Sequence, residues 1–215
     1  MRLQPVLHAL PFLLQAAATT VWVSLLGMAV GQVLGVLICI GRRSRVPLLD
    51  RAGALYVSIF RGVPLLVQLL LIYDVLPRVG LNVPPLVAAV SGLGLASAAY
   101  VSEIFRGALN AVPVGQAEAA AAMGFPRRVI WLRILLPQAL RLSVPALVNE
   151  LILLLKASSL VTQVGVTELT RTSHSWAATT YRPLEMYLAA AVIYLAMTLS
   201  LAGVGQWTER LLRRD

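Results

Sequence analysis

The sequence predicts an all-α, polytopic membrane protein with five transmembrane helices. Of the 215 residues, 59% are hydrophobic and only 13% are charged, and the mean hydropathy is +0.81. Water-soluble domains carry roughly 25% charged residues, so this composition excludes an ordinary soluble protein. A spanning helix uses about 20 mostly apolar residues. The chain is therefore expected to form a single transmembrane domain over residues 1–215, with no separate soluble domain.

Five long apolar segments are the expected spans. They cover about residues 12–41, 52–76, 85–106, 139–161 and 186–207. The first uncharged stretch is longer than the roughly 7–15 residues of a signal-peptide core, so we expect a retained span. The second contains Arg61 and Pro64, and it is expected to bend near the proline. Arg61 and Gln68 share one face there; a structural role at the bend is the preferred interpretation, and substrate contact is the alternative.

The arginines predict the orientation of the chain in the membrane. Twelve of the 18 basic residues lie between spans one and two, around the connection between spans three and four, or after span five. Four lie on the opposite side. Because Lys and Arg near span ends are retained in the cytoplasm, the N-terminus is expected outside and the C-terminus inside. This topology accounts for the net charge of +9, and no nucleic-acid partner is expected.

Two rare residue types limit the chemistry of the chain. Lys156 is the single lysine and follows Leu155, so the Gly-Lys-Ser/Thr ending of a phosphate-binding loop is missing. Cys39 is the single cysteine and lies in an apolar run, which favours a buried filler over a metal ligand. No nucleophile with a base at motif spacing is present. We therefore expect no catalysis, no metal and no cofactor in this chain.

Glycines recur at every fourth position of the first span. Gly27, Gly31 and Gly35 lie on one helix face, where small residues allow a neighbouring backbone to approach closely. Apolar segments contain such spacings by chance as well. A packing face and a chance spacing both remain open.

The connection between spans three and four is about 30 residues long, more than neighbouring helices require. Residues 116–123 are strongly helix-forming, Gly124 suits a left-handed helix stop, and Pro126 suits the first turn of a second helix. Pro137 is expected to end that second helix. Segment 113–137 is thus expected to form two short cytoplasmic helices that meet at Gly124 and receive another protein.

The same segment resembles a family motif. It matches every fixed position of EAA-x3-G-x9-I-x-LP, the EAA motif of the membrane subunits of bacterial ABC importers. The matching residues are Glu118, Ala119, Ala120, Gly124, Ile134, Leu136 and Pro137. Residues 60–68, 102–108 and 155–161 are similar to the permeases for polar amino acids of the histidine and glutamine class. Ala157 replaces a usual Asp and Val63 a common Thr, which leaves the substrate open.

The resemblance implies the type I importer permease fold and a role in transport without catalysis. The EAA segment would form a coupling helix in a cleft of a separate subunit that binds ATP and magnesium. The assembly would contain a second permease subunit, identical or closely related, and two ATP-binding subunits. A periplasmic or extracellular amino-acid-binding protein would deliver a polar amino acid for import across the bacterial inner membrane. An ion-gradient-driven secondary transporter and a non-transporting membrane scaffold are the alternatives.

Ionisable residues within the spans are candidates for function, because each one costs at least about 2.5 kcal/mol at the bilayer centre. Glu103 and Arg106 have the spacing of a helix-surface ion pair. Glu150 is expected near mid-membrane, with Lys156 further along and Asn149 on the Lys156 face. An anion for the ammonium and a cation for the carboxylate are what a zwitterion needs, so Asn149, Glu150 and Lys156 are candidate substrate contacts. Alternatively, Glu150 and Lys156 pair with each other or across two permease copies.

Overall fold

The computed structural model describes residues 4–44 and 46–212, and all regular elements in these ranges are helical. Four helices are long and apolar enough to cross a membrane, and a sharply bent pair adds a fifth candidate span. The predicted all-α, five-span fold class is confirmed. The α-helices are α1 Gln4–Arg42, α2 Pro47–Gly62, α3 Leu65–Leu70, α4 Pro85–Ala111, α5 Val114–Ala122, α6 Arg127–Val129, α7 Leu136–Ala157, α8 Leu169–Thr180 and α9 Pro183–Leu212.

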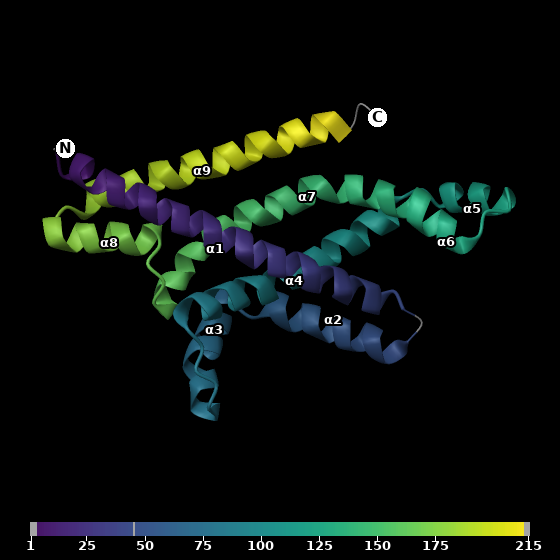
Figure 1. Ribbon diagram of the computed structural model, residues 1–215, viewed down its shortest axis with the longest axis horizontal. Coiled ribbons are helices and arrows are strands. Elements are labelled where there is room, and N and C mark those ends of the chain that lie inside the picture. Colours follow the sequence, from purple (N-terminus) through teal and green to yellow (C-terminus); the bar gives the residue numbers. More distant parts are fainter. Residues whose placement is uncertain (1–3, 45, 213–215) are drawn as a thin grey trace.

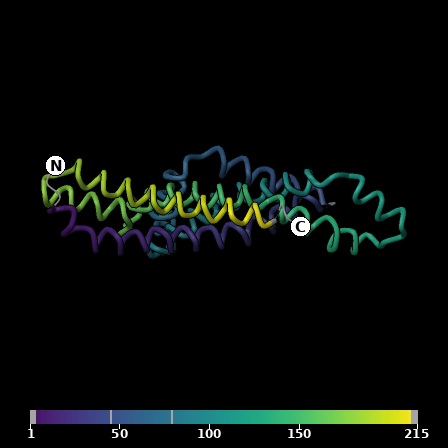
Figure 2. Tube along the Cα trace, turned by 90° about the horizontal axis from the view of Figure 1, so that it is seen from above, coloured from purple at the N-terminus to yellow at the C-terminus, as the bar shows by residue number. Residues whose placement is uncertain are grey.

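The molecule is elongated, and its two ends differ in composition. In Figure 1, the start of α1 and helix α8 lie at one end, and α5 and α6 lie at the other. The end of α1, the start of α2 and the end of α9 also lie toward α5 and α6. Figure 2 shows the same arrangement from above. The fold therefore brings the arginine-rich segments toward one end of the bundle.

Helices α1 and α4 pack along the glycine seam, which we define as Gly27, Gly31 and Gly35. All three glycines are buried. A Cβ atom added to Gly31 would lie 2.8 Å from the Cβ of Ser97, and one added to Gly35 would lie 2.7 Å from the Cβ of Val101. Such distances are shorter than real carbon contacts, so only glycine allows this approach. The four-residue spacing is thus a packing face against α4.

The second candidate span is broken at Pro64. Helix α2 ends at Gly62, Pro64 precedes α3 in an extended conformation, and the axes before and after the break differ by 106°. A proline in the interior of a helix removes one hydrogen bond and clashes with the preceding turn, which explains the break. The expected bend is confirmed. After α3 the chain continues as a π-helical turn, Leu71–Val75, and a 3₁₀ turn, Leu76–Val79.

The second helix of segment 113–137 does not end at Pro137, contrary to the sequence-based expectation. Helix α6 continues through a π-helical turn, Ile130–Leu135, directly into α7, which carries Pro137 in its first turn. The π-helical turn before Pro137, in which Leu136 N–H donates to the Trp131 carbonyl five residues back, interrupts the α-helical bonding pattern at this position. A helical segment of 38 residues, Arg127–Val164, results; it ends in the 3₁₀ turn Ser158–Val164.

At the opposite end, the helices extend beyond the expected spans. Helix α1 begins at Gln4, before the first expected span, and it includes Pro11. Helix α8 lies between the fourth and fifth expected spans, where the sequence predicts no span because this Thr- and Ser-rich stretch is not apolar enough. Glu168 caps this helix, and both of its carboxylate oxygens accept backbone N–H groups, from Thr170 and Arg171, at 2.8 Å.

Candidate functional site

The turn between α5 and α6 is built around Gly124. Helix α5 ends with two crossing backbone bonds: Phe125 N–H donates to the Ala120 carbonyl at 3.1 Å, and Gly124 N–H donates to Ala121 at 3.0 Å. This is the Schellman arrangement, which places the residue after the helix in the left-handed region. Gly124 accordingly has φ +81°. Pro126 lies just before α6 as its N-cap rather than in its first turn.

Most EAA residues of this segment face away from the rest of the chain. Glu118, Ala119, Gly124, Leu136 and Pro137 are exposed, Ile134 is half-buried, and Ala120 is buried. Two apolar neighbours are also exposed, Val114 at 72% and Met123 at 76%. The segment therefore presents both the motif and apolar side chains to whatever lies outside this chain.

Arg43, which directly follows α1, contacts both the end of α4 and this segment. The Arg43 guanidinium donates to the Asn110 side-chain oxygen at 2.8 Å and lies 5.6 Å from the centre of the Trp131 ring. A guanidinium over an indole face is a favourable cation–π contact. Arg43 thus connects α1, the end of α4 and the π-helical turn.

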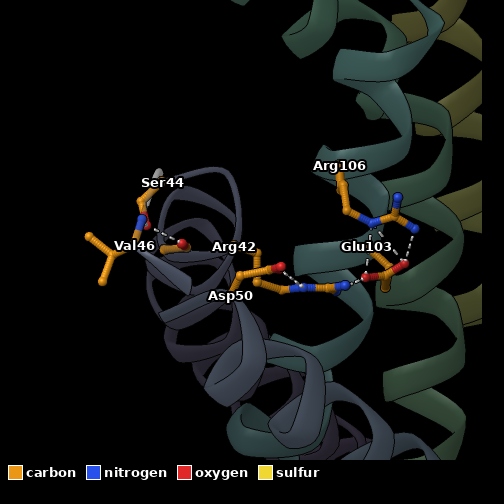
Figure 3. Close-up of polar contacts among 7 residues, drawn as sticks. Arg42, Ser44, Val46, Asp50, Glu103 and Arg106 are labelled. Carbon is orange, nitrogen blue, oxygen red and sulfur yellow. Dashed lines mark hydrogen bonds and ion pairs between the residues drawn. The ribbon is translucent and has the colours of Figure 1, made fainter. Parts of the chain in front are cut away.

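A charged cluster joins α1, α2 and α4 close to this attachment. Figure 3 shows Arg42 extending from the end of α1 to Glu103 on α4, with Asp50 of α2 on its other side. Arg106 contacts the same carboxylate, with its Nε atom 3.2 Å from both oxygens. The predicted pair of Glu103 and Arg106 is confirmed. Sequence spacing missed Arg42 because it lies 61 residues away in the chain.

Glu150 lies in a cavity between α2–α3, α4 and α7. Its side chain is 6% exposed, and Ser97 Oγ donates to one carboxylate oxygen at 3.0 Å. The cavity has a volume of about 310 Å³ and is also lined by Gln68 and Tyr100. It contains Glu150, which the sequence singles out, and Gln68, whose helical register with Arg61 leaves substrate contact as an alternative. Ser97 and Tyr100 have no signal in the sequence.

Asn149 and Lys156 lie apart from this cavity. Both side chains are exposed, and the α7 residues that line the cavity are Glu150, Leu153, Leu154 and Ala157. Helical geometry explains the separation, because residues three and four apart share a face whereas Lys156 is six positions from Glu150. Within the described residues, Glu150 and Lys156 form no ion pair with each other. The structure thus separates the three candidate substrate contacts into one cavity residue and two surface residues.

Metal ligands do not gather at either site. Over residues 4–44 and 46–212, no group of three or more His, Cys, Asp or Glu side chains is placed to hold a metal ion. Cys39 is buried, as its apolar surroundings predict. The polar groups present can bind and orient an organic molecule.

Comparison with known proteins identifies the family. Residues 24–214 match the model of the binding-protein-dependent transport system inner membrane component, and the chain belongs to this family. The arginine transport system permease protein ArtQ of Bacillus subtilis (strain 168) is 38% identical over 207 residues, covering 96% of this chain and 94% of that protein. The glutamine transport system permease protein GlnP of Escherichia coli (strain K12) is 37% identical over 204 residues, covering 94% and 93%.

Solved structures agree with this assignment. A crystal structure of an amino acid ABC transporter with histidines has a chain that matches with a TM-score of 0.94 and 35% identity, covering 98% of each chain. A chain of the MetNI methionine ABC transporter in an inward-facing conformation matches with a TM-score of 0.75 and 26% identity, covering 99% of each. The chain is a multi-pass membrane permease subunit of an ABC importer. It is not an enzyme, because ATP hydrolysis in such importers belongs to a separate subunit.

Proposed function

We propose that this chain forms one half of an import pore for a polar amino acid in the bacterial inner membrane. A second permease subunit, identical or related, completes the pore. Two ATP-binding subunits, which hold ATP and magnesium, dock on the two coupling segments 113–137. A periplasmic or extracellular binding protein delivers the amino acid. Relatives named for arginine and glutamine transport support this substrate class.

The exposed EAA segment is the observation that carries the proposal. Ala119, Met123 and Gly124 are exposed, and a Cβ added to Gly124 would meet open space. A slim alanine-rich helix with apolar neighbours suits insertion into a groove of a partner protein. Because the second helix of the segment is continuous with α7, the docking site connects to the helix that carries Glu150.

The proposed orientation places segment 113–137 in the cytoplasm. The three arginine-rich segments lie toward the same end of the bundle as α5 and α6, which fits retention of basic residues inside. The N-terminus is then outside and the C-terminus inside. The single transmembrane domain has its spans near residues 12–41, 52–76, 85–106, 139–161 and 186–207, with the helices extending beyond several of these limits.

Glu150, Asn149 and Lys156 are proposed to contact the amino acid at different stages of its passage. Glu150 lies in the cavity, where an ammonium group fits its carboxylate. Asn149 and Lys156 are exposed on the single chain. An exposed lysine in a membrane span needs water or a polar partner, so Lys156 is expected to face the path between two permease subunits rather than lipid.

Co-purification and uptake test the function together. The permease is expected to purify with a stoichiometric ATPase, and reconstituted vesicles should take up a polar amino acid only when ATP and the binding protein are supplied. Uptake by the permease alone, driven by an ion gradient, would support a secondary transporter. Absence of both a bound ATPase and uptake would favour a scaffold.

A further inference from the structure

A mostly apolar cavity lies between α1, α4 and α7, at the arginine-rich end of the chain. Its volume is about 510 Å³, within the roughly 300–1,000 Å³ that is typical of small-molecule sites. Val36, Ile40, Phe105 and Leu140 are among the side chains that line it. It shares no lining residue with the cavity beside Glu150. Because an apolar wall cannot compensate the charges of a polar amino acid, the occupant of this cavity is expected to be a hydrocarbon.

Several residues of the cavity wall are also exposed at the surface of the chain. Ile40 is 62% exposed, Leu140 46% and Trp131 42%. The cavity is therefore open to its surroundings, which in a membrane span are largely acyl chains. Protein interiors are close-packed, and the walls of an empty space lose dispersion contacts. An acyl chain that enters from the bilayer would restore those contacts.

Arg43 places a positive charge at the edge of the cavity. Its contacts are with neutral groups: the Asn110 side-chain oxygen at 2.8 Å, and the Trp131 ring, whose centre is 5.6 Å away. Within the described residues Arg43 forms no ion pair, whereas the preceding Arg42 contacts two carboxylates. No Asp or Glu is among the described residues that line the cavity. A guanidinium has five N–H donors, so Arg43 can bind an oxyanion while it keeps its bond to Asn110.

The apolar space and the charge follow each other along α1. Ile40 and Val36 precede Arg43 by about one and two helical turns. Arg43 directly follows α1, whose end lies toward α5 and α6 (Figure 1), and this end is cytoplasmic in the orientation proposed above. Trp131 suits that depth, because aromatic side chains are enriched where the membrane meets water. A basic pocket between spanning helices on the cytoplasmic side fits an anionic lipid headgroup.

We propose that this cavity binds one anionic phospholipid of the cytoplasmic leaflet. An acyl chain occupies the apolar space, and the headgroup phosphate accepts hydrogen bonds from the Arg43 guanidinium. The wall includes Trp131 and Leu136, which belong to segment 113–137, as well as residues of α1 and α4. The bound lipid therefore connects the base of the proposed docking segment to the bundle. The site is independent of the transported substrate.

Two lipids with identical acyl chains test the role of the headgroup charge. Dioleoylphosphatidylglycerol is anionic, and dioleoylphosphatidylcholine is zwitterionic. Native mass spectrometry of the detergent-purified permease–ATPase complex measures the affinity for the first lipid bound per permease subunit. The wild type is expected to bind phosphatidylglycerol about fivefold more tightly than phosphatidylcholine. Arg43→Gln should bring this ratio close to one, and Arg43→Lys, which keeps the charge, should retain most of the preference. Inorganic phosphate has no chain and should not displace the lipid.

Arg51→Gln is the matched control for Arg43→Gln. Arg51 is exposed near the start of α2, toward the same end of the bundle, and it does not line the cavity. Removal of the same charge at this position should leave the lipid preference at its wild-type value. An equal loss of preference in the two variants would assign the preference to the overall charge of the chain and overturn the proposed site.

Leu140→Trp tests the space for the acyl chain without changing Arg43. The larger ring would occupy part of the cavity, so the affinity for both lipids should fall several-fold. Leu142→Trp adds the same side chain at an exposed position of α7 that does not line the cavity, and both affinities should stay at the wild-type value. This pair also serves as the test if size-exclusion chromatography shows that Arg43→Gln does not assemble. Equal affinities of the two variants would overturn the proposal.

Two results for the wild type would also overturn the proposal. One is equal affinity for the two lipids. The other is an assembled complex that binds neither lipid, which would show that a partner such as the second permease subunit covers the cavity. ATP-driven uptake in vesicles is measured separately, so the proposed transport function stands in both cases.

Discussion

The glycine seam of α1 and the turn at Gly124 use the same residue type for opposite reasons. At Gly35 the space is filled: an added Cβ would lie 2.7 Å from Val101. At Gly124 the space is open, since an added Cβ would have only its own chain neighbours within 4 Å. The backbone there, however, has φ +81°. The first glycine is required by packing inside the chain, and the second by the shape that the chain presents to a partner. Loss of the first should prevent folding, whereas loss of the second should impair coupling.

Gly35→Val is expected to have the largest effect. Its branched side chain would overlap Val101 and the backbone of α4, and overpacking of this kind costs about 1–3 kcal/mol or more. We expect little folded protein in detergent, measured by fluorescence-detected size-exclusion chromatography. Gly203→Val in α9 is the control, because that glycine has open space around it. Equal yields of the two variants would contradict a close-packed seam.

Gly124→Asp should separate folding from coupling. A non-glycine residue in the left-handed region costs roughly 1–2 kcal/mol, so the α5–α6 turn is expected to change shape while the spans still insert. In reconstituted vesicles, the amount of amino acid taken up per ATP hydrolysed should fall sharply. Gly115→Ala, also in open space but within α5, should keep the wild-type ratio. An unchanged ratio for Gly124→Asp would remove the role assigned to the segment.

Glu103→Ala tests how much the charged contact between α1 and α4 stabilises the fold. Its carboxylate compensates Arg42, whose side chain is 16% exposed, and the loss should lower the stability by about 1–2 kcal/mol after allowance for solvent screening. Glu185→Ala removes a local pair with Arg182, the residue just before α9, where about 0.2–0.5 kcal/mol is expected. Chemical denaturation of the two variants measures the difference. Equal losses would show that the contact between helices contributes nothing beyond the local pair.

Glu168 should make the stability of the α8 end depend on pH. Burial raises the pKa of the Glu168 carboxyl, and the N–H groups of Thr170 and Arg171 oppose part of that rise. The folded state then binds the proton more tightly than the unfolded state. Stability is greatest below the ordinary pKa, 4.5, and is lost as pH rises through the raised pKa. Thermal unfolding across this range should show a slope that Glu168→Gln reduces; an unchanged slope would assign it to other groups.

Local sequence signals predicted the parts of the fold that local chemistry determines. Gly124 predicted a left-handed stop and Pro64 a bend, because each residue restricts its own backbone. Helix α8 was not predictable in this way. Its cap, Glu168, is buried by groups distant in the chain: Tyr194 OH donates to the carboxylate at 2.9 Å, and Thr20 Oγ1 accepts the N–H of Leu169 at 3.2 Å.

The candidate site was predictable to a similar degree. The EAA residues were found because they lie in one short stretch of sequence. Glu150 was found as an unusual charge in an apolar span, but its partner Ser97 comes from another helix. Arg42 joins Glu103 for the same reason, through packing of α1 on α4. Side chains that meet through tertiary packing leave no spacing pattern in a single sequence.

The continuous helical segment Arg127–Val164 is about 57 Å long by helical rise. One end lies beside the Gly124 turn, and Glu150 lies more than halfway along it. The Gly124 turn therefore has a continuous helical connection to the cavity beside Glu150. The π-helical turn Ile130–Leu135 lies within this connection, between the Gly124 turn and Glu150, and its hydrogen bonds span five residues instead of four. A change in the winding of this turn would shift Glu150 relative to segment 113–137, which we propose as the docking site.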